Sequence, residues 1–110
     1  MPSDHLDTGF VLVPPKGKAK FTVTARSMFR LKRIECLQGD VRRLKITSIS
    51  VNGNRNELIT QDGIPFIVFQ NAPARLLFST CFADQTIEVT LEETTNQGQV
   101  VELRLHGDTP

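Results

Sequence analysis

The residues of this chain with the greatest chemical capability are two histidines, two cysteines and a few neighbouring carboxylates. A Ser or Cys nucleophile needs a base nearby, yet His5 and His106 lie at opposite ends of the chain and in no recognisable nucleophile motif. Glu92 and Glu93 are adjacent, so on a strand they would point to opposite faces and could not share a proton. We therefore expect no catalytic residue and predict that the protein is not an enzyme.

Metal and cofactor sites find no better support. Among Cys36, Cys81, His5 and His106, no two lie within four positions of each other, which is unlike the spacing of metal ligands. No glycine-rich loop leads into a helix, as a phosphate-binding loop would. We expect neither a metal nor a cofactor. The two thiols are expected to be reduced and mostly buried, with a single bridge between strands as the alternative.

The cations are concentrated in one part of the chain. Residues 16–45 hold ten of the thirteen Lys and Arg residues but only two carboxylates, which gives this segment a net charge of +8. Residues 46–110 carry −5, from three Arg against eight carboxylates, and residues 1–15 carry −2. This asymmetry is the most informative feature of the composition.

Three interpretations of the basic segment stay open. It can be the solvated outer face of a sheet, a surface that meets the acidic part of a second copy, or a site for an anionic ligand. The second needs the two segments to face apart, so that the domain is dipolar; reversing Arg42 and Arg43 to Glu should then weaken self-association and leave the fold intact. The chain has no Trp or Tyr to stack on bases or sugars. The candidate interface or anion-binding residues are Lys16, Lys18, Lys20, Arg30, Lys32, Arg33, Arg42, Arg43 and Lys45.

The elements that must position these cations divide the chain in two. Residues 1–17 show little periodicity and contain Pro14, Pro15 and Gly17, so they are expected to form an N-terminal arm. An apolar stretch within the arm could anchor it on a neighbour; the candidate anchor residues are Phe10, Val11, Leu12 and Val13. Residues 18–110 are expected to form a single β-sandwich domain.

From Lys18 onward the apolar residues alternate with polar ones, which is typical of half-buried strands. The alternation slips by one residue near Lys32–Arg33, and again between residues 44–46 and 49–51, which predicts a β-bulge in each of two strands. Asn52-Gly53 predicts a hairpin turn. The segments 64–69 and 75–82 are also expected to be strands, and no window requires a helix.

The clearest hairpin is expected at the end of the chain. Residues 87, 89 and 91 should point inward, as should residues 101, 103 and 105, with the turn Thr95–Gly98 between the two strands. The register stays open: one loop places Leu91 opposite Leu103, and a shifted loop places Glu88 opposite Arg104. Either register would bring Arg104 close enough to the carboxylates for surface ion pairing.

Seven to eight short strands with a turn signal every 8–12 residues predict an all-β protein. We expect a single β-sandwich of jelly-roll or Greek-key type. No stretch approaches the roughly 18 apolar residues of a membrane-spanning helix, so we expect no membrane span.

Several segments resemble small single-domain β-sandwich proteins from virions of tailless or related bacterial viruses. They are FRLKRI, KITSISVNGNRNEL, GIPFIVF, RLLF and QTIEVTLEETTNQGQVVELRLHG, within about residues 20–107. The resemblance implies a jelly-roll-like structural subunit located in the virion, which contacts copies of itself and other virion proteins and has no active-site residues. The chain is shorter than a typical major capsid protein, so a minor or small repeating subunit is expected.

Our leading hypothesis is therefore a non-enzymatic structural protein that self-assembles as a virion or shell subunit, such as a minor capsid or vertex-type jelly roll. The alternative is a β-sandwich module that binds an anionic partner, nucleic acid or anionic lipid, through residues 16–45. Nucleic acid is a possible partner without a specific signature, because no RNA- or DNA-recognition motif is visible.

Overall fold

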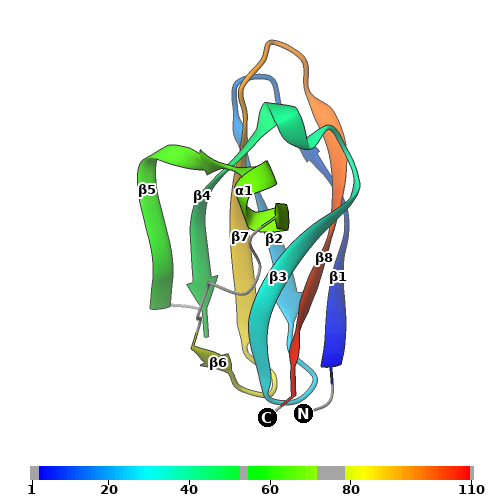
Figure 1. Cartoon of the computed structure of the whole chain (residues 1–110), viewed down its shortest axis with the longest axis vertical. Coiled ribbons are helices and arrows are strands. Elements are labelled where there is room, and N and C mark those ends of the chain that lie inside the picture. The colour runs from blue at the N-terminus through cyan, green and yellow to red at the C-terminus, as the bar shows by residue number, and fades with distance from the viewer. Residues whose placement is uncertain (1–2, 53–54, 72–78, 110) are drawn as a thin grey trace.

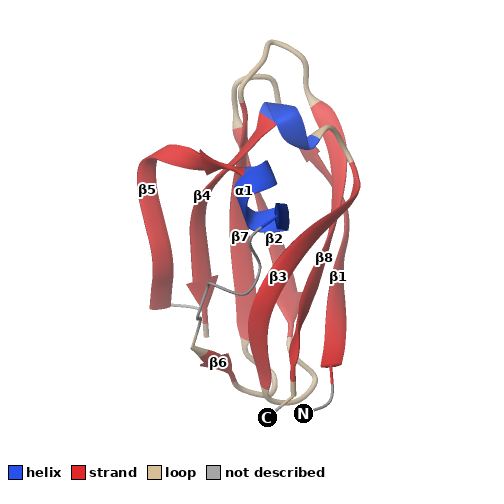
Figure 2. Ribbon diagram, in the orientation of Figure 1, coloured by secondary structure: helices blue, strands red, loops and turns tan. Residues whose placement is uncertain are grey.

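The computed structural model describes residues 3–52, 55–71 and 79–109, which fold into a sandwich of two four-stranded antiparallel sheets (Figures 1 and 2). The first sheet contains, in spatial order, β1 (Ser3–Val13), β8 (Gln99–Asp108), β3 (Phe29–Gln38) and β6 (Thr80–Cys81). The second contains β2 (Lys18–Thr24), β7 (Thr86–Glu93), β4 (Leu44–Val51) and β5 (Arg55–Pro65). The helical segments are η1 (Val41–Arg43) and α1 (Phe66–Asn71). The predicted all-β sandwich is confirmed.

The strands pair from the outside of the chain inward. The first strand pairs with the eighth, the second with the seventh, the third with the sixth and the fourth with the fifth, always antiparallel. The chain thus behaves as one long hairpin that is folded over on itself, with the β4–β5 connection at its tip. Two further ladders, β3–β8 and β4–β7, join neighbouring turns of this ribbon into the two sheets.

The core lies between the sheets and is built by alternation along the strands. Every second residue of β7 is buried, including Ile87, Val89 and Leu91, and the matching residues of β8 are buried as well. These inward positions were predicted correctly. Among the described residues, Phe21, Phe29 and Phe66 are the largest fully buried side chains, with Phe66 contributed by α1, which packs against β3, β4 and β5 (Figure 2).

Both predicted bulges are present. The register of β3 against β8 shifts between Leu31 and Arg33, and that of β4 against β7 shifts between Ile46 and Ser48. In each strand the extra residue changes the parity, so that apolar residues on both sides of the bulge face the core. Asn52 begins the turn after β4 with a positive φ of 60°. The other residue of the predicted turn pair, Gly53, lies outside the described residues.

The prediction of an N-terminal arm is wrong for residues 3–13. These residues form β1, which pairs with β8 from Ser3 opposite Asp108 to Val13 opposite Gln99. A register shift between Asp7 and Phe10, with Gly9 at φ 75°, moves the inward parity from Leu6 to Val11 and Val13. This bulge hides the alternation in the sequence, and the backbone hydrogen bonds to β8 hold the segment in the sheet.

The prediction of a closing hairpin is also wrong. β7 and β8 lie in different sheets, so the connection 94–98 crosses from one sheet to the other at the end of the sandwich opposite the two termini (Figure 1). Neither proposed register exists: Leu103 lies opposite Cys36, and Glu88 lies opposite Thr22 and Ser50. Arg104 is therefore not near the carboxylates of β7.

Of two smaller predictions about the segment 64–82, one is wrong and the other is confirmed only for Thr80 and Cys81. Pro65 ends β5, an edge strand, and residues 66–71 form the helix α1 instead of continuing a strand. The predicted strand 75–82 is reduced to β6 within the described residues, and its positions 75–78 lie outside them. The short helix α1 begins where the edge strand β5 ends, and it places the side chain of Phe66 in the core.

Gly107 lets β3 and β8 lie closer together than a side chain at this position would allow. Gly107 lies opposite Asp4 of β1 and Leu31 of β3. A β-carbon at position 107 would lie 2.1 Å from the carbonyl oxygen of Arg30. Since that distance is far below van der Waals contact, no other residue fits without separating β3 from β8. Gly107 thus keeps β3 and β8, the two central strands of the first sheet, paired near the end of the sandwich where the termini lie.

Candidate functional site

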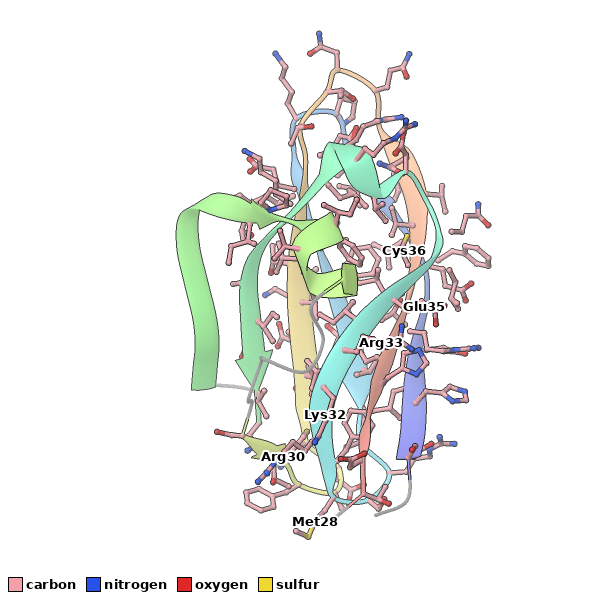
Figure 3. The ribbon with its side chains drawn as sticks, in the orientation of Figure 1. Met28, Arg30, Lys32, Arg33, Glu35 and Cys36 are labelled. Atoms are coloured by element: carbon pink, nitrogen blue, oxygen red, sulfur yellow. The ribbon has the colours of Figure 1, made fainter. Side chains whose placement is uncertain are left out.

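The cations of the basic segment are divided between both faces and one end of the sandwich. Lys18, Lys20 and Lys45 lie on the outer face of the second sheet. Arg30, Lys32 and Arg33 lie along β3 on the first sheet (Figure 3). Lys16 lies in the β1–β2 turn, and Arg42 and Arg43 belong to η1. Both segments lie at the upper end of the sandwich, which is the end opposite the two termini (Figure 1). The structure does not bring the nine candidate residues together on one surface.

The condition for a dipolar domain is not met, because acidic and basic strands alternate in space. The acidic β7 lies between the basic strands β2 and β4, and Glu92 is opposite both Lys18 and Lys45. Several cations form ion pairs within the chain: Lys20 with Glu88 at 3.2 Å, Lys32 with Asp108 at 3.1 Å, Arg42 with Asp40 at 3.1 Å and Arg43 with Glu93 at 2.7 Å. Strand order thus places carboxylates of the acidic remainder next to several cations of the basic segment.

Arg43 takes part in a buried polar network at the upper end. The side chain of Glu93 is completely buried and accepts hydrogen bonds from Arg43 at 2.7 Å, from the hydroxyl of Thr95 at 2.6 Å and from the amide of Gln99 at 3.0 Å. Arg43 also donates to the carbonyl of Gln97 at 2.6 Å. The network therefore joins η1 to the β7–β8 connection.

The environment of Glu93 keeps its carboxylate ionised. Burial alone would raise the pKa of Glu93, but the hydrogen bonds from Thr95, Gln99 and Arg43 outweigh burial and hold the pKa below its ordinary value. Reversal of Arg43 to Glu would place a second carboxylate against this buried one. The expectation that reversing both arginines leaves the fold intact is therefore not supported for Arg43, whereas the exposed Arg42 contacts only the neighbouring Asp40 in the described structure.

The predicted anchor residues split into two sets. Val13 is fully buried and Val11 packs against the core, so these two side chains belong to the sandwich itself. Phe10 and Leu12 point the other way and are each 63% exposed. Val100, directly opposite Leu12 on β8, is 44% exposed. Phe10, Leu12 and Val100 therefore form an apolar patch on the upper outer face of the first sheet, and this patch is the candidate site.

Sequence reasoning missed the contribution of Val100 to this patch. Val100 and Val101 are adjacent and equally apolar, but Val101 is fully buried while Val100 shares the outward parity of Glu102 and Arg104. The outward parity of Arg104 and His106 was the available signal. The sequence does not show that β1 lies beside β8, so it could not predict that Val100 lies next to Leu12.

The lower half of the same face is charged. Arg104 donates to Asp7 at 2.7 and 3.1 Å, and Nε2 of His106 lies 2.8 Å from Oε1 of Glu35. Each of these hydrogen bonds lowers the pKa of the carboxyl group that it contacts. The ring of His5 lies 6.2 Å from that of His106. His106 thus has a carboxylate partner, rather than being simply solvated at a strand end.

The two thiols of the chain are at least partly buried. The thiol of Cys36 is half-buried and donates to the carbonyl of Gln38, and burial raises its pKa, which disfavours the reactive thiolate. Cys81 is buried, and both thiols are free. Within the ranges 3–52, 55–71 and 79–109, no three His, Cys, Asp or Glu side chains are grouped to hold a metal ion.

An open groove of about 440 Å³ runs along the side of the sandwich where β1 passes β2. Its lining includes His5, Asp7, Thr22 and Arg26, and the hydrogen bonds of Asp7 go to Arg104 outside the lining set. The groove therefore holds a histidine and a carboxylate without a hydrogen bond between them. It marks the place where the free edges of two sheets lie close together.

No helix within the described part of the chain has the length and apolar character needed to cross a membrane. The candidate site consists of an apolar patch next to a charged cluster on the outer face of the first sheet, and the outer face of the second sheet is polar. Comparison with models of protein families, with curated proteins and with solved structures finds no match to this chain.

Proposed function

We propose that this protein is a non-enzymatic structural subunit with a jelly-roll fold, which associates with copies of itself as a minor component of a virion or similar shell. The jelly-roll assignment is supported by the pairing order. A ribbon in which strand one pairs with eight, two with seven, three with six and four with five, wrapped into two four-stranded sheets, is the arrangement expected of a jelly roll.

The observation that carries the self-association is the exposure of Phe10, Leu12 and Val100. A lone exposed apolar side chain is ordinary, but three neighbours on one sheet face are unfavourable in water unless a partner covers them. Below the patch, Arg104 binds Asp7 and His106 binds Glu35. Glu102 lies opposite Phe10 and shares the outward parity of Val100, so a contact through the patch must leave this carboxylate in water.

The proposed contact differs from the one that the charge pattern suggested. Four of the ten cations of the +8 segment form ion pairs within the described chain, and Lys18 and Lys45 lie opposite Glu92, so charge pairing between copies is not proposed as the main driving force. The resemblance of the sequence to virion proteins supports the placement in a shell. Association with other virion proteins would use the same kind of apolar contact.

A single substitution tests the proposal. Replacing Leu12 with Lys places a charge in the centre of the patch and should raise the dissociation constant for self-association at least tenfold, because the ammonium would have to be desolvated. Thr22→Lys is the matched control, since Thr22 is exposed on β2 and lies opposite Glu88. Sedimentation velocity of both variants and the parent measures the effect. Equal association of the Leu12 variant and the parent would overturn the assignment of the patch.

The alternative, an anionic partner bound through residues 16–45, is decided by the same samples. The candidate cations occupy opposite faces, so a single ligand could reach only a subset of them. A monomer that retards DNA or binds anionic vesicles in a salt-dependent way would favour this alternative over self-association.

A further inference from the structure

The free edges of the two sheets differ in how they are protected against pairing with another chain. β2 carries Lys18 and Lys20, and charged side chains on an edge strand oppose the addition of a further strand. β1 is also an edge strand, but residues 3–13 contain no Lys, Arg or Pro. Its upper part, residues 8–13, carries no charge at all. The upper edge of β1 is therefore open to another strand.

The bulge in β1 limits how much of this edge can pair. The register shift between Asp7 and Phe10, with Gly9 at φ 75°, interrupts the regular backbone below Phe10. Bulges increase the local twist and stop a ladder from continuing. Only the segment 9–13 therefore offers a regular edge, and it is the segment that carries Phe10 and Leu12.

The pattern of side chains in this segment matches itself under a two-fold axis. Residues directly opposite each other in an antiparallel pair point to the same face. An axis at Val11 places Phe10 opposite Leu12 of the second copy, and both are outward and exposed. An axis between two residues would instead set outward against inward side chains and disrupt both cores.

The other residue-centred axes fit less well. An axis at Phe10 would set Leu12 opposite Thr8, whose hydroxyl is already bonded to the backbone of Gly9. An axis at Leu12 would set Phe10 opposite Pro14, which lies beyond the end of the strand and cannot donate a hydrogen bond. Val11 is therefore the position that joins the two apolar patches into one surface.

Charge complementarity favours a second copy as the occupant. The lower half of β1 carries Asp4 and also Asp7, whose carboxylate pairs with Arg104 of the same chain, while the turn above β1 carries Lys16, whose side chain is exposed. Antiparallel pairing about Val11 directs the acidic half of each β1 towards the Lys16 turn of the other copy. The uncharged centre avoids like-charge contacts across the axis.

We propose that two copies of this protein pair antiparallel through the upper edge of β1, about a two-fold axis at Val11, so that the two first sheets continue into one sheet across the dimer. This arrangement rests on the proposed self-association and names its geometry. Backbone hydrogen bonds at the edge fix the register, and the pairs formed by Phe10 and Leu12 across the axis supply the apolar contact, with Val100 one strand in from the edge on the same face.

Hydrogen exchange on the unmodified protein tests the edge without a mutation. Amides of residues 9–13 that do not bond to β8 should exchange at least tenfold more slowly at concentrations where the protein associates than where it is monomeric. Amides of β2 should be unchanged, because its lysine-bearing edge stays open to water. Equal exchange of residues 9–13 in both samples would contradict edge pairing.

A cross-link tests the position of the axis. Val11→Cys places two thiols opposite each other across the axis, where β-carbons are about 5 Å apart in antiparallel pairs. Mild oxidation should give a covalent dimer, whereas the parent, with Cys36 and Cys81, and the Thr22→Cys control should give less than a tenth as much. An associating Val11→Cys protein that cross-links no better than the control would overturn the axis and leave the proposed function standing. A protein that never associates would overturn both.

Discussion

The outer faces of the two sheets are built from the same kinds of strand, yet they meet water in different ways. On the face of β2, β7 and β4, lysines and glutamates lie side by side, as in the pair Lys20–Glu88 and the row Lys18–Glu92–Lys45. The face of β1 and β8 has a charged lower half and an apolar upper half, with Phe10, Leu12 and Val100 exposed. The charges of one face have neighbours of opposite sign within the chain, whereas the other face carries a group of exposed apolar side chains.

The comparison shows that charge along the sequence and charge in space are different quantities. The basic segment and the acidic remainder suggest a dipolar domain when read in sequence order. Strand order instead places β7 between β2 and β4 and neutralises the polar face internally. One group of exposed apolar side chains, Phe10 and Leu12 with Val100, lies where the sequence suggested a separate arm.

The largest effect on stability is expected around Glu93, the carboxylate of β7 that points away from the polar face. Glu92 lies on that face, but the adjacent Glu93 is buried and depends on Arg43. Arg43→Ala should lower the free energy of unfolding by about 3 kcal/mol, because it leaves a buried carboxylate without its cation. Urea denaturation measures this, with the exposed neighbour Arg42→Ala as the control, which should match the parent. Equal losses in the two variants would contradict the burial of Glu93.

Val100 tests whether the face, and not only the edge, contributes to association. Val100 lies on β8, one strand in from the edge, opposite Leu12. Val100→Lys should raise the dissociation constant about tenfold, equivalent to about 1.4 kcal/mol, while the melting temperature of the monomer is unchanged. Thr90→Lys on the polar face should have no effect on association. If both variants associate like the parent, the difference between the two faces has no functional meaning.

The pKa of Glu93 predicts how stability depends on pH. Because its folded pKa lies below the ordinary value of 4.5, ionised Glu93 stabilises the fold above that pH, and this stabilisation is lost as the pH falls through the folded pKa. The free energy of unfolding should therefore decrease below about pH 5. Glu93→Gln should be less stable at neutral pH and show a shallower decrease. An identical acid slope in both proteins would assign the pH dependence to other carboxyl groups.

The smallest effect is expected on the polar face itself. Lys20 is largely exposed, and its ion pair with Glu88 lies in water. Lys20→Ala should cost about 0.5 kcal/mol at low salt, and the difference from the parent should disappear at high salt because the charges are screened. Thermal unfolding at both ionic strengths measures this. A loss comparable to that of Arg43→Ala would show that the polar face depends on its ions.

Local pattern predicted the strands better than it predicted their neighbours. Alternation correctly placed Ile87, Val89 and Leu91 inside, and the parity slips correctly located the bulges in β3 and β4. The same alternation cannot say which strand lies beside which. The short connection 94–98 suggested a hairpin between β7 and β8. A connection of this length can equally carry the chain from one sheet to the other, as it does here.

Each feature that the sequence did not predict has its own physical cause. The bulge at Gly9 divides the apolar pattern of β1 into two halves of opposite parity, so the strand reads as an irregular arm. The helix α1 has only six residues, too few to show a helical period. The patch was found only in part, because joining Val100 to Phe10 and Leu12 requires the β1–β8 ladder, a contact between the two ends of the chain.

Sedimentation velocity of the parent protein over a range of concentrations, at low and at high salt, tests the central claim most directly. The account predicts a defined oligomer that forms with increasing concentration, persists at high salt because the contact is apolar, and is lost in Leu12→Lys but not in Thr22→Lys. A protein that stays monomeric under all these conditions, or an oligomer that dissociates at high salt and ignores Leu12→Lys, would contradict it.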